Sequence, residues 1–157
     1  MESAEELRER ERELVAERAA AAPYVDYPPT PRWYPPFMGL WATGYTAVLG
    51  VPREHAMLQA LGQLVLLVVM IGFQVWYRRY RGTWPRGKAP AEVRRVLAAF
   101  VVGAVVVIGL VALALWLGPL WIAVVVAFVL VTIGVSWYEA VYARAAARTR
   151  TRLGGVA

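Results

Sequence analysis

The chain has 157 residues, of which 59% are hydrophobic and 18% are charged, and its net charge is +6. Because ordinary soluble domains are only about 45–50% apolar, this composition predicts an all-α integral membrane protein. The absence of cysteine excludes disulfides and thiolate chemistry, and a single histidine, His55, cannot form a histidine cluster for zinc. With no phosphate-binding loop, serine-hydrolase elbow or H-E-x-x-H motif, we expect no enzymatic activity and no cofactor or metal site.

Residues 1–22 are rich in glutamate, arginine and alanine, which favours a charged helical arm on the cytoplasmic side of the membrane. A thin apolar stripe runs through Leu7, Leu14 and Ala21. The stripe is compatible with one seam of a short coiled coil. A solvated helix near the membrane surface is the simpler interpretation, since two heptads of leucine and alanine bury little area.

Residues 23–36 form a linker rich in proline and aromatic residues, with the sequence YPPTPRWYPP at its end. Each proline removes a helix donor and restricts the residue before it, so we predict an extended lead without regular helix. We expect Arg32 and Trp33 to anchor it at the membrane surface, and the first span to start between Tyr34 and Phe37. The alternative is that these prolines bind an aromatic groove of a partner protein.

Residues 37–142 are predicted to form a four-helix transmembrane bundle made of two antiparallel hairpins. A span needs about 20 apolar residues at about 1.5 Å per residue. The four expected spans are about 36–51, 55–77, 94–117 and 120–142. Pro52 and Pro119 each follow a glycine-containing turn and are expected to open the next helix.

The basic residues predict how the chain is oriented. The 78–95 segment holds seven basic residues against one acidic residue, and the tail, 143–157, which we expect to continue the fourth helix, is also basic. By the positive-inside rule, both segments and both termini should lie on the cytoplasmic side of an inner (plasma) membrane. Anionic lipid headgroups are the expected partners rather than nucleic acid, because no nucleic-acid-binding motif accompanies the charge. The expected headgroup contacts are Arg78, Arg79, Arg81, Arg94, Arg95, Arg144 and Arg148.

Two polar stripes interrupt the apolar spans, one on the second expected span and one on the fourth. Their members are Gln59, Gln63, Gln74, Thr132, Ser136 and Glu139. Because a polar group at this depth needs a partner, we interpret the stripes as a hydrogen-bonded seam inside the bundle. A hydrated path or a ligand cleft is the alternative. For Glu139 we predict a contact with an arginine of the 78–95 segment or of the tail.

The first expected span carries a stripe of small residues, which is typical of close helix packing. The stripe consists of Gly39, Thr43, Ala47 and Gly50. Trp41 and Tyr45 lie opposite it and too deep to be interface anchors at that end. They are candidates for the lining of a pocket for an apolar or aromatic ligand.

The composition resembles that of small membrane proteins of high-GC bacteria, a resemblance that implies no particular site. We expect a non-enzymatic membrane interaction or accessory protein, a subunit or scaffold with a protein partner. The alternative is a small transporter or channel that acts as a homo-oligomer. The size is similar to that of small multidrug transporters, but the first span here lacks the glutamate that those proteins carry. A membrane enzyme would need a carboxylate-rich or metal-binding interior, which the spans lack.

Overall fold

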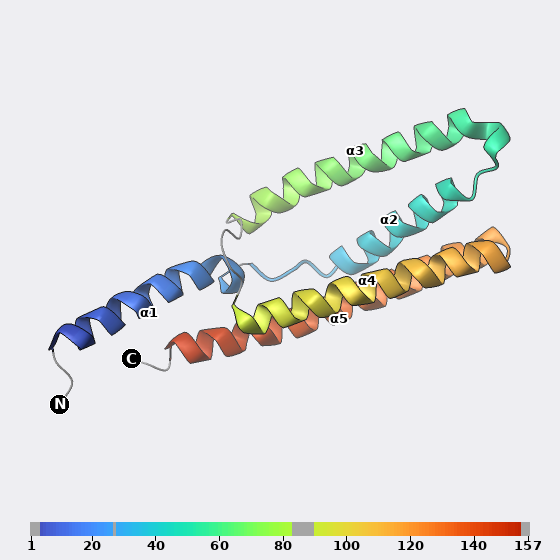
Figure 1. The fold of residues 1–157 in the computed structure, drawn as a ribbon. Coiled ribbons are helices and arrows are strands. Elements are labelled where there is room, and N and C mark those ends of the chain that lie inside the picture. The colour runs from blue at the N-terminus through green and yellow to red at the C-terminus, as the bar shows by residue number, and fades with distance from the viewer. Residues whose placement is uncertain (1–3, 27, 83–89, 155–157) are drawn as a thin grey trace.

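The computed structural model describes residues 4–26, 28–82 and 90–154. This part of the chain is helical and contains no strand (Figure 1). Its elements are α1 (Ala4–Val25), α2 (Tyr34–Leu49), the short 3-10 helix η1 (Arg53–His55), α3 (Ala56–Arg81), α4 (Ala91–Leu117) and α5 (Leu120–Gly154). The predicted all-helical class is therefore confirmed.

Helix α1 extends beyond the predicted end of the arm at residue 22. It continues through Pro23 to Val25. An internal proline costs a backbone hydrogen bond, yet the last turn is held in place because Ala21, Tyr24 and Val25 are buried. Tertiary packing, which local sequence does not report, overrides the proline here.

The proline-rich segment ends where α2 begins, at Tyr34. Pro35 and Pro36 occupy the first helical positions, where a missing amide hydrogen breaks no helix bond. Residues 28–33, called the lead below, have no regular helix, and the Tyr34 amide donates to the Pro31 carbonyl at 3.0 Å. The start of α2 lies within the predicted range.

The remaining helices are longer than the expected spans. α3 runs to Arg81 rather than to residue 77, and α4 begins at Ala91 rather than at 94. α5 continues to Gly154, so the predicted continuation of the fourth helix into the tail is confirmed. Gly118, in an extended conformation, separates α4 from α5, and Pro119 precedes the first residue of α5.

The helices make their main contacts in the order α3, α2, α5, α4. α5 packs against both α2 and α4, whereas α3 packs against α2 (Figure 1). α2 and α3 run antiparallel, as do α4 and α5. The C-terminal end of α1 contacts the C-terminal part of α5, and the N-terminal part of α1 extends away from α2, α3 and α4. α5 is therefore the helix around which the others are arranged.

Small residues allow α2 to approach α5 closely. A Cβ atom placed on Gly39 would overlap the Thr132 side chain and lie 3.0 Å from the Phe128 carbonyl oxygen. Near the other end of α2, a Cβ on Gly50 would press on the Leu120 side chain. The expected close packing through small residues is thus present, and its partner is α5.

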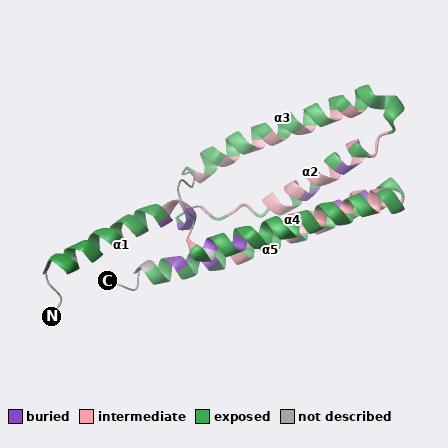
Figure 2. Cartoon of the chain, viewed as in Figure 1, coloured by how far each residue is buried: buried purple, intermediate pink, exposed green. Residues whose placement is uncertain are grey.

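The best-buried hydrophobic cluster lies where α1, α4 and α5 meet. Its members are Tyr24, Val25, Val93, Val96, Tyr142, Ala145 and Ala146. Beyond this cluster, much of α3, α4 and α5 is exposed (Figure 2), and many of the exposed residues on these helices are large and apolar. The molecule is therefore tightly packed at one end and apolar on its outside along most of its length.

Three helical segments of the described chain are long and apolar enough to cross a membrane. They are Arg53–Arg81, Val93–Leu117 and Leu120–Arg152. Apolar surfaces of this extent are unfavourable in water, and a lipid environment removes that cost. These are features of a membrane protein. With 16 residues, α2 is about 24 Å long at about 1.5 Å per residue, which is short for a span. A fourth span through α2 stays a prediction.

Candidate functional site

Aromatic rings join the beginning of α2 to the end of α3. This aromatic cluster consists of Trp33, Tyr34, Phe37, Phe73, Trp76, Tyr77 and Tyr80. The ring centres of Trp33 and Trp76 are 5.0 Å apart, and those of Phe37 and Phe73 are 4.9 Å apart. Such pairs contribute about 0.5–1.5 kcal/mol each beyond their burial. The cluster therefore fixes the start of α2 beside the last turns of α3.

Arg81, at the end of α3, connects this cluster to α5. Its guanidinium carbon lies 5.0 Å from the ring centre of Tyr77 and 6.0 Å from the ring centre of Tyr142. Both distances are within the range of cation–π attraction. Because α2 has not yet begun at this level, Arg81 reaches α5 directly.

Glu139 on α5 is half-buried and binds the lead. Its predicted contact with an arginine stays a prediction, because part of the 78–95 segment lies outside the described residues. The Thr30 hydroxyl donates a hydrogen bond to its carboxylate, with 2.5 Å between Oγ1 and Oε2. Arg81 belongs to the same neighbourhood, because the same tyrosines interact electrostatically with both charges. These tyrosines are Tyr34, Tyr77, Tyr138 and Tyr142. We call this set, with Thr30, Arg81 and Glu139, the tyrosine junction.

A second bond ties the lead to α3. The Tyr80 hydroxyl donates to the Pro29 carbonyl oxygen at 2.9 Å. Together with the bond from Thr30 to Glu139, this places the lead between α3 and α5 at the tyrosine junction. The sequence predicted an extended lead but gave no indication of which helices would hold it.

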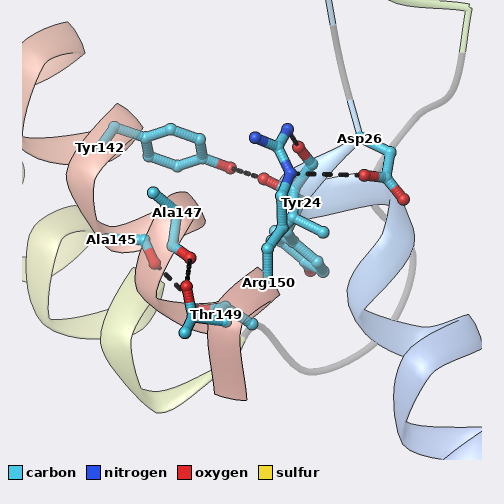
Figure 3. A network of polar contacts seen from close by, with 9 residues as sticks. Tyr24, Asp26, Tyr142, Ala145, Ala147, Thr149 and Arg150 are labelled. Carbon is cyan, nitrogen blue, oxygen red and sulfur yellow. Dashed lines mark hydrogen bonds and ion pairs between the residues drawn. The ribbon is translucent and has the colours of Figure 1, made fainter. Parts of the chain in front are cut away.

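The last turn of α1 is held by the C-terminal half of α5 (Figure 3). The buried Tyr142 hydroxyl donates to the Tyr24 carbonyl at 3.0 Å. Arg150 donates to the Val25 carbonyl, and its Nε lies 3.5 Å from the Asp26 carboxylate. Three side-chain contacts therefore satisfy groups at the C-terminal end of α1, where helix carbonyls lack partners within the helix.

A further ion pair lies along α1. Arg152 Nη1 is 2.7 Å from Glu17 Oε1, with both side chains about half exposed at 47%. Pairs this exposed contribute little to stability, about 0–1 kcal/mol. Arg150 and Arg152 were not among the arginines predicted to contact headgroups. Asp26, the single aspartate of the chain, was the signal that could have indicated a partner for Arg150.

The two predicted polar stripes lie on helices that α2 separates. On α3, Gln59 is half-buried, while Gln63 and Gln74 are exposed. On α5, the Ser136 hydroxyl donates to the Thr132 carbonyl of its own helix at 2.7 Å. The Thr132 hydroxyl is buried against α2 and has no hydrogen-bond partner within the described residues. A seam between the stripes stays a prediction.

Trp41 and Tyr45 stack on each other with 5.7 Å between ring centres. They line an apolar cavity of about 490 Å³ between α2 and α4, with Ala127 and Val131 of α5 among its lining residues. The Trp41 indole also donates to the Leu66 carbonyl of α3 at 3.2 Å. The two aromatics thus border a cavity, as the sequence suggested, while the ligand stays a prediction.

The arginines predicted to contact headgroups lie at the end of the molecule that holds the tyrosine junction, on the last turns of α3, the first turns of α4 and the C-terminal part of α5. All are exposed except Arg81, which is half-buried. Residues 83–89 of the basic connection lie outside the described residues. This end therefore combines aromatic rings and exposed positive charge, a combination suited to the interface between lipid and water.

The site contains hydrogen-bond donors, one half-buried carboxylate and one half-buried guanidinium, a set that can hold segments together or bind a polar ligand. Within the described residues, no group of three or more His, Asp or Glu side chains is placed to bind a metal ion. Comparison of the chain with known protein families, with curated proteins and with solved structures found no match.

Proposed function

We propose that the chain is a non-enzymatic membrane interaction protein, an accessory subunit or scaffold that presents α1 to a cytoplasmic protein partner. The observation that carries this proposal is the way α1 is mounted. Its last turn is buried against α5, while residues 8–13 and 15–20 are exposed. A charged helix fixed at one end offers a partner a surface that is already ordered, which lowers the entropic cost of binding.

The proposal includes four spans with both termini on the cytoplasmic side of an inner membrane. Two observations support it. Contact between Trp33 and Trp76 places the start of α2 beside the last turns of α3, which favours a course for α2 alongside α3 into the membrane. The exposed arginines gather at that same end, where the positive-inside rule and anionic headgroups favour them.

Site-specific photo-crosslinking in intact cells tests the proposed partner. Val15 is 63% exposed on α1 and suits a photoreactive replacement, while Trp116, 82% exposed at the far end of α4, provides the control. We expect a protein adduct from position 15 that position 116 does not give. Lipid adducts alone, or the same adduct from both positions, would contradict the proposal.

A small transporter or channel is the second candidate, because an apolar cavity of about 490 Å³ lies between α2 and α4. Purified protein in liposomes should then carry a substrate coupled to protons, and Glu139→Gln should abolish the coupling. Flux that is indistinguishable from empty liposomes would exclude this function and favour the accessory role.

A further inference from the structure

Helix α3 lies at one edge of the helix row and uses only one of its sides for packing. Gly62, Leu66 and Phe73 lie against α2. No residue in the most apolar part of α3 is buried. The rest of its surface is therefore open to lipid or to another protein.

One flank of α3 carries a repeat of small, polar and apolar residues that does not belong to the contact with α2. Ala60, Gln63, Leu67, Met70 and Gln74 recur at alternating steps of three and four residues, the spacing of a helix–helix seam. Successive residues of a helix differ by about 100° in direction. The flank therefore lies beside the α2 side, at about 40–120° from the direction of Leu66. All five members are exposed except Met70, which is half-buried.

Glutamine is costly on a surface that faces lipid. Its amide offers both donors and an acceptor, and hydrocarbon satisfies neither. No hydrogen bond joins Gln63 or Gln74 to another part of the chain that the structure describes. Gln63 lies well inside the apolar length of α3, between Arg53 and Arg81, and Gln74 lies one turn before Arg78.

An identical helix supplies the missing partners. Copies of one membrane protein share the same orientation, so equivalent residues lie at the same depth. Two parallel α3 helices would bring each glutamine opposite its own counterpart, and amides are self-complementary because each can donate to and accept from the other. Ala60 lets the backbones approach closely near the η1 end.

We propose that the chain self-associates through a parallel pairing of α3 with α3 of a second copy, joined by Gln63 and Gln74. The pairing goes beyond the proposed accessory function. The pairing uses no part of α1. The self-association and the accessory function can therefore be refuted independently of each other.

The absence of cysteine from the sequence permits a clean crosslinking test. Leu67→Cys places a thiol on the flank, and Val68→Cys places one at the next position, pointing away from it. The two native side chains have similar exposure, 55% and 60%. In native membranes treated with a mild oxidant, we expect a disulfide-linked dimer from Leu67→Cys and little from Val68→Cys. Equal dimer yields, no dimer, or a link from Leu67→Cys to a different protein would each overturn the proposal.

A second set of variants tests the glutamines themselves. Replacing Gln63 and Gln74 together by leucine keeps α3 apolar, and we expect it to lower dimer affinity about tenfold, the order expected from two weak interhelical pairs. Gln59→Leu is the matched control, because Gln59 is half-buried and faces the α2 side, about 20° from the direction of Leu66. The readout is the disulfide yield of Leu67→Cys as the protein is diluted with lipid. An unchanged yield in the double variant would overturn the role of the glutamines.

Discussion

Gly39→Ala should separate α2 from α5 and destabilise the protein. The new Cβ would overlap the Thr132 hydroxyl, which can rotate away, but it would also lie 3.0 Å from the Phe128 carbonyl oxygen, which belongs to the backbone of α5. Since ordinary contact begins near 3.4 Å, the helices must move apart by roughly 0.4 Å. Overpacking of this kind costs about 1–3 kcal/mol.

The measurement needs a control, because alanine is also the better helix former by about 1 kcal/mol. Gly72→Ala in α3 gains the same propensity, and a Cβ there meets nothing within 4 Å. The difference between the two variants therefore isolates the packing cost, which we expect to be about 1–3 kcal/mol in free energy of unfolding. Reversible unfolding in mixed detergent micelles measures it. If Gly39→Ala is as stable as Gly72→Ala, the close contact of Gly39 with α5 is refuted.

Three further predictions concern the junction and the topology. Tyr142→Phe removes the hydrogen bond to the Tyr24 carbonyl, and we expect it to lower the free energy of unfolding by about 0.5–1.5 kcal/mol. Backbone amides in the last turn of α1 should then exchange hydrogen faster, and an unchanged exchange rate would contradict this. Glu139→Gln and Arg81→Gln should each lower the free energy of unfolding. The double variant should lose less than the sum of the two single losses, because the two charges share one site. Strictly additive losses would show that the two charges act independently. Reporter fusions after Ala157 and within the arm should both behave as cytoplasmic, and a translocated arm would leave three spans.

Element bounds were largely predictable because they depend on local composition. The start of α2 at Tyr34 follows from Pro35 and Pro36, and the breaks before α3 and α5 follow from glycine and proline. The continuation of α1 through Pro23 was not predictable, because it depends on Tyr142, more than a hundred residues away in sequence. Local rules cannot report packing between such distant segments.

The lateral order of the helices was the main feature that could not be predicted from the sequence. Spacing placed the glutamines on one face of the second expected span, but it could not indicate that α2 would separate that helix from α5. Nor could spacing indicate that Thr30 of the lead would donate a hydrogen bond to Glu139. Which residue contacts a half-buried charge depends on neighbouring helices, and hydrophobic periodicity does not define these neighbours.

The prolines of the lead have a physical role that extends beyond stiffness. A helix would use its own carbonyl oxygens, whereas an extended, proline-rich segment leaves them free to accept from elsewhere. The Tyr80 hydroxyl uses one of them, at Pro29, and the adjacent Thr30 donates to Glu139. One short segment without regular structure thereby joins α3 to α5 at a level where α2 has not yet begun. A helical segment at the same place would span less distance and offer fewer acceptors, so the composition of the lead suits its position between the two helices.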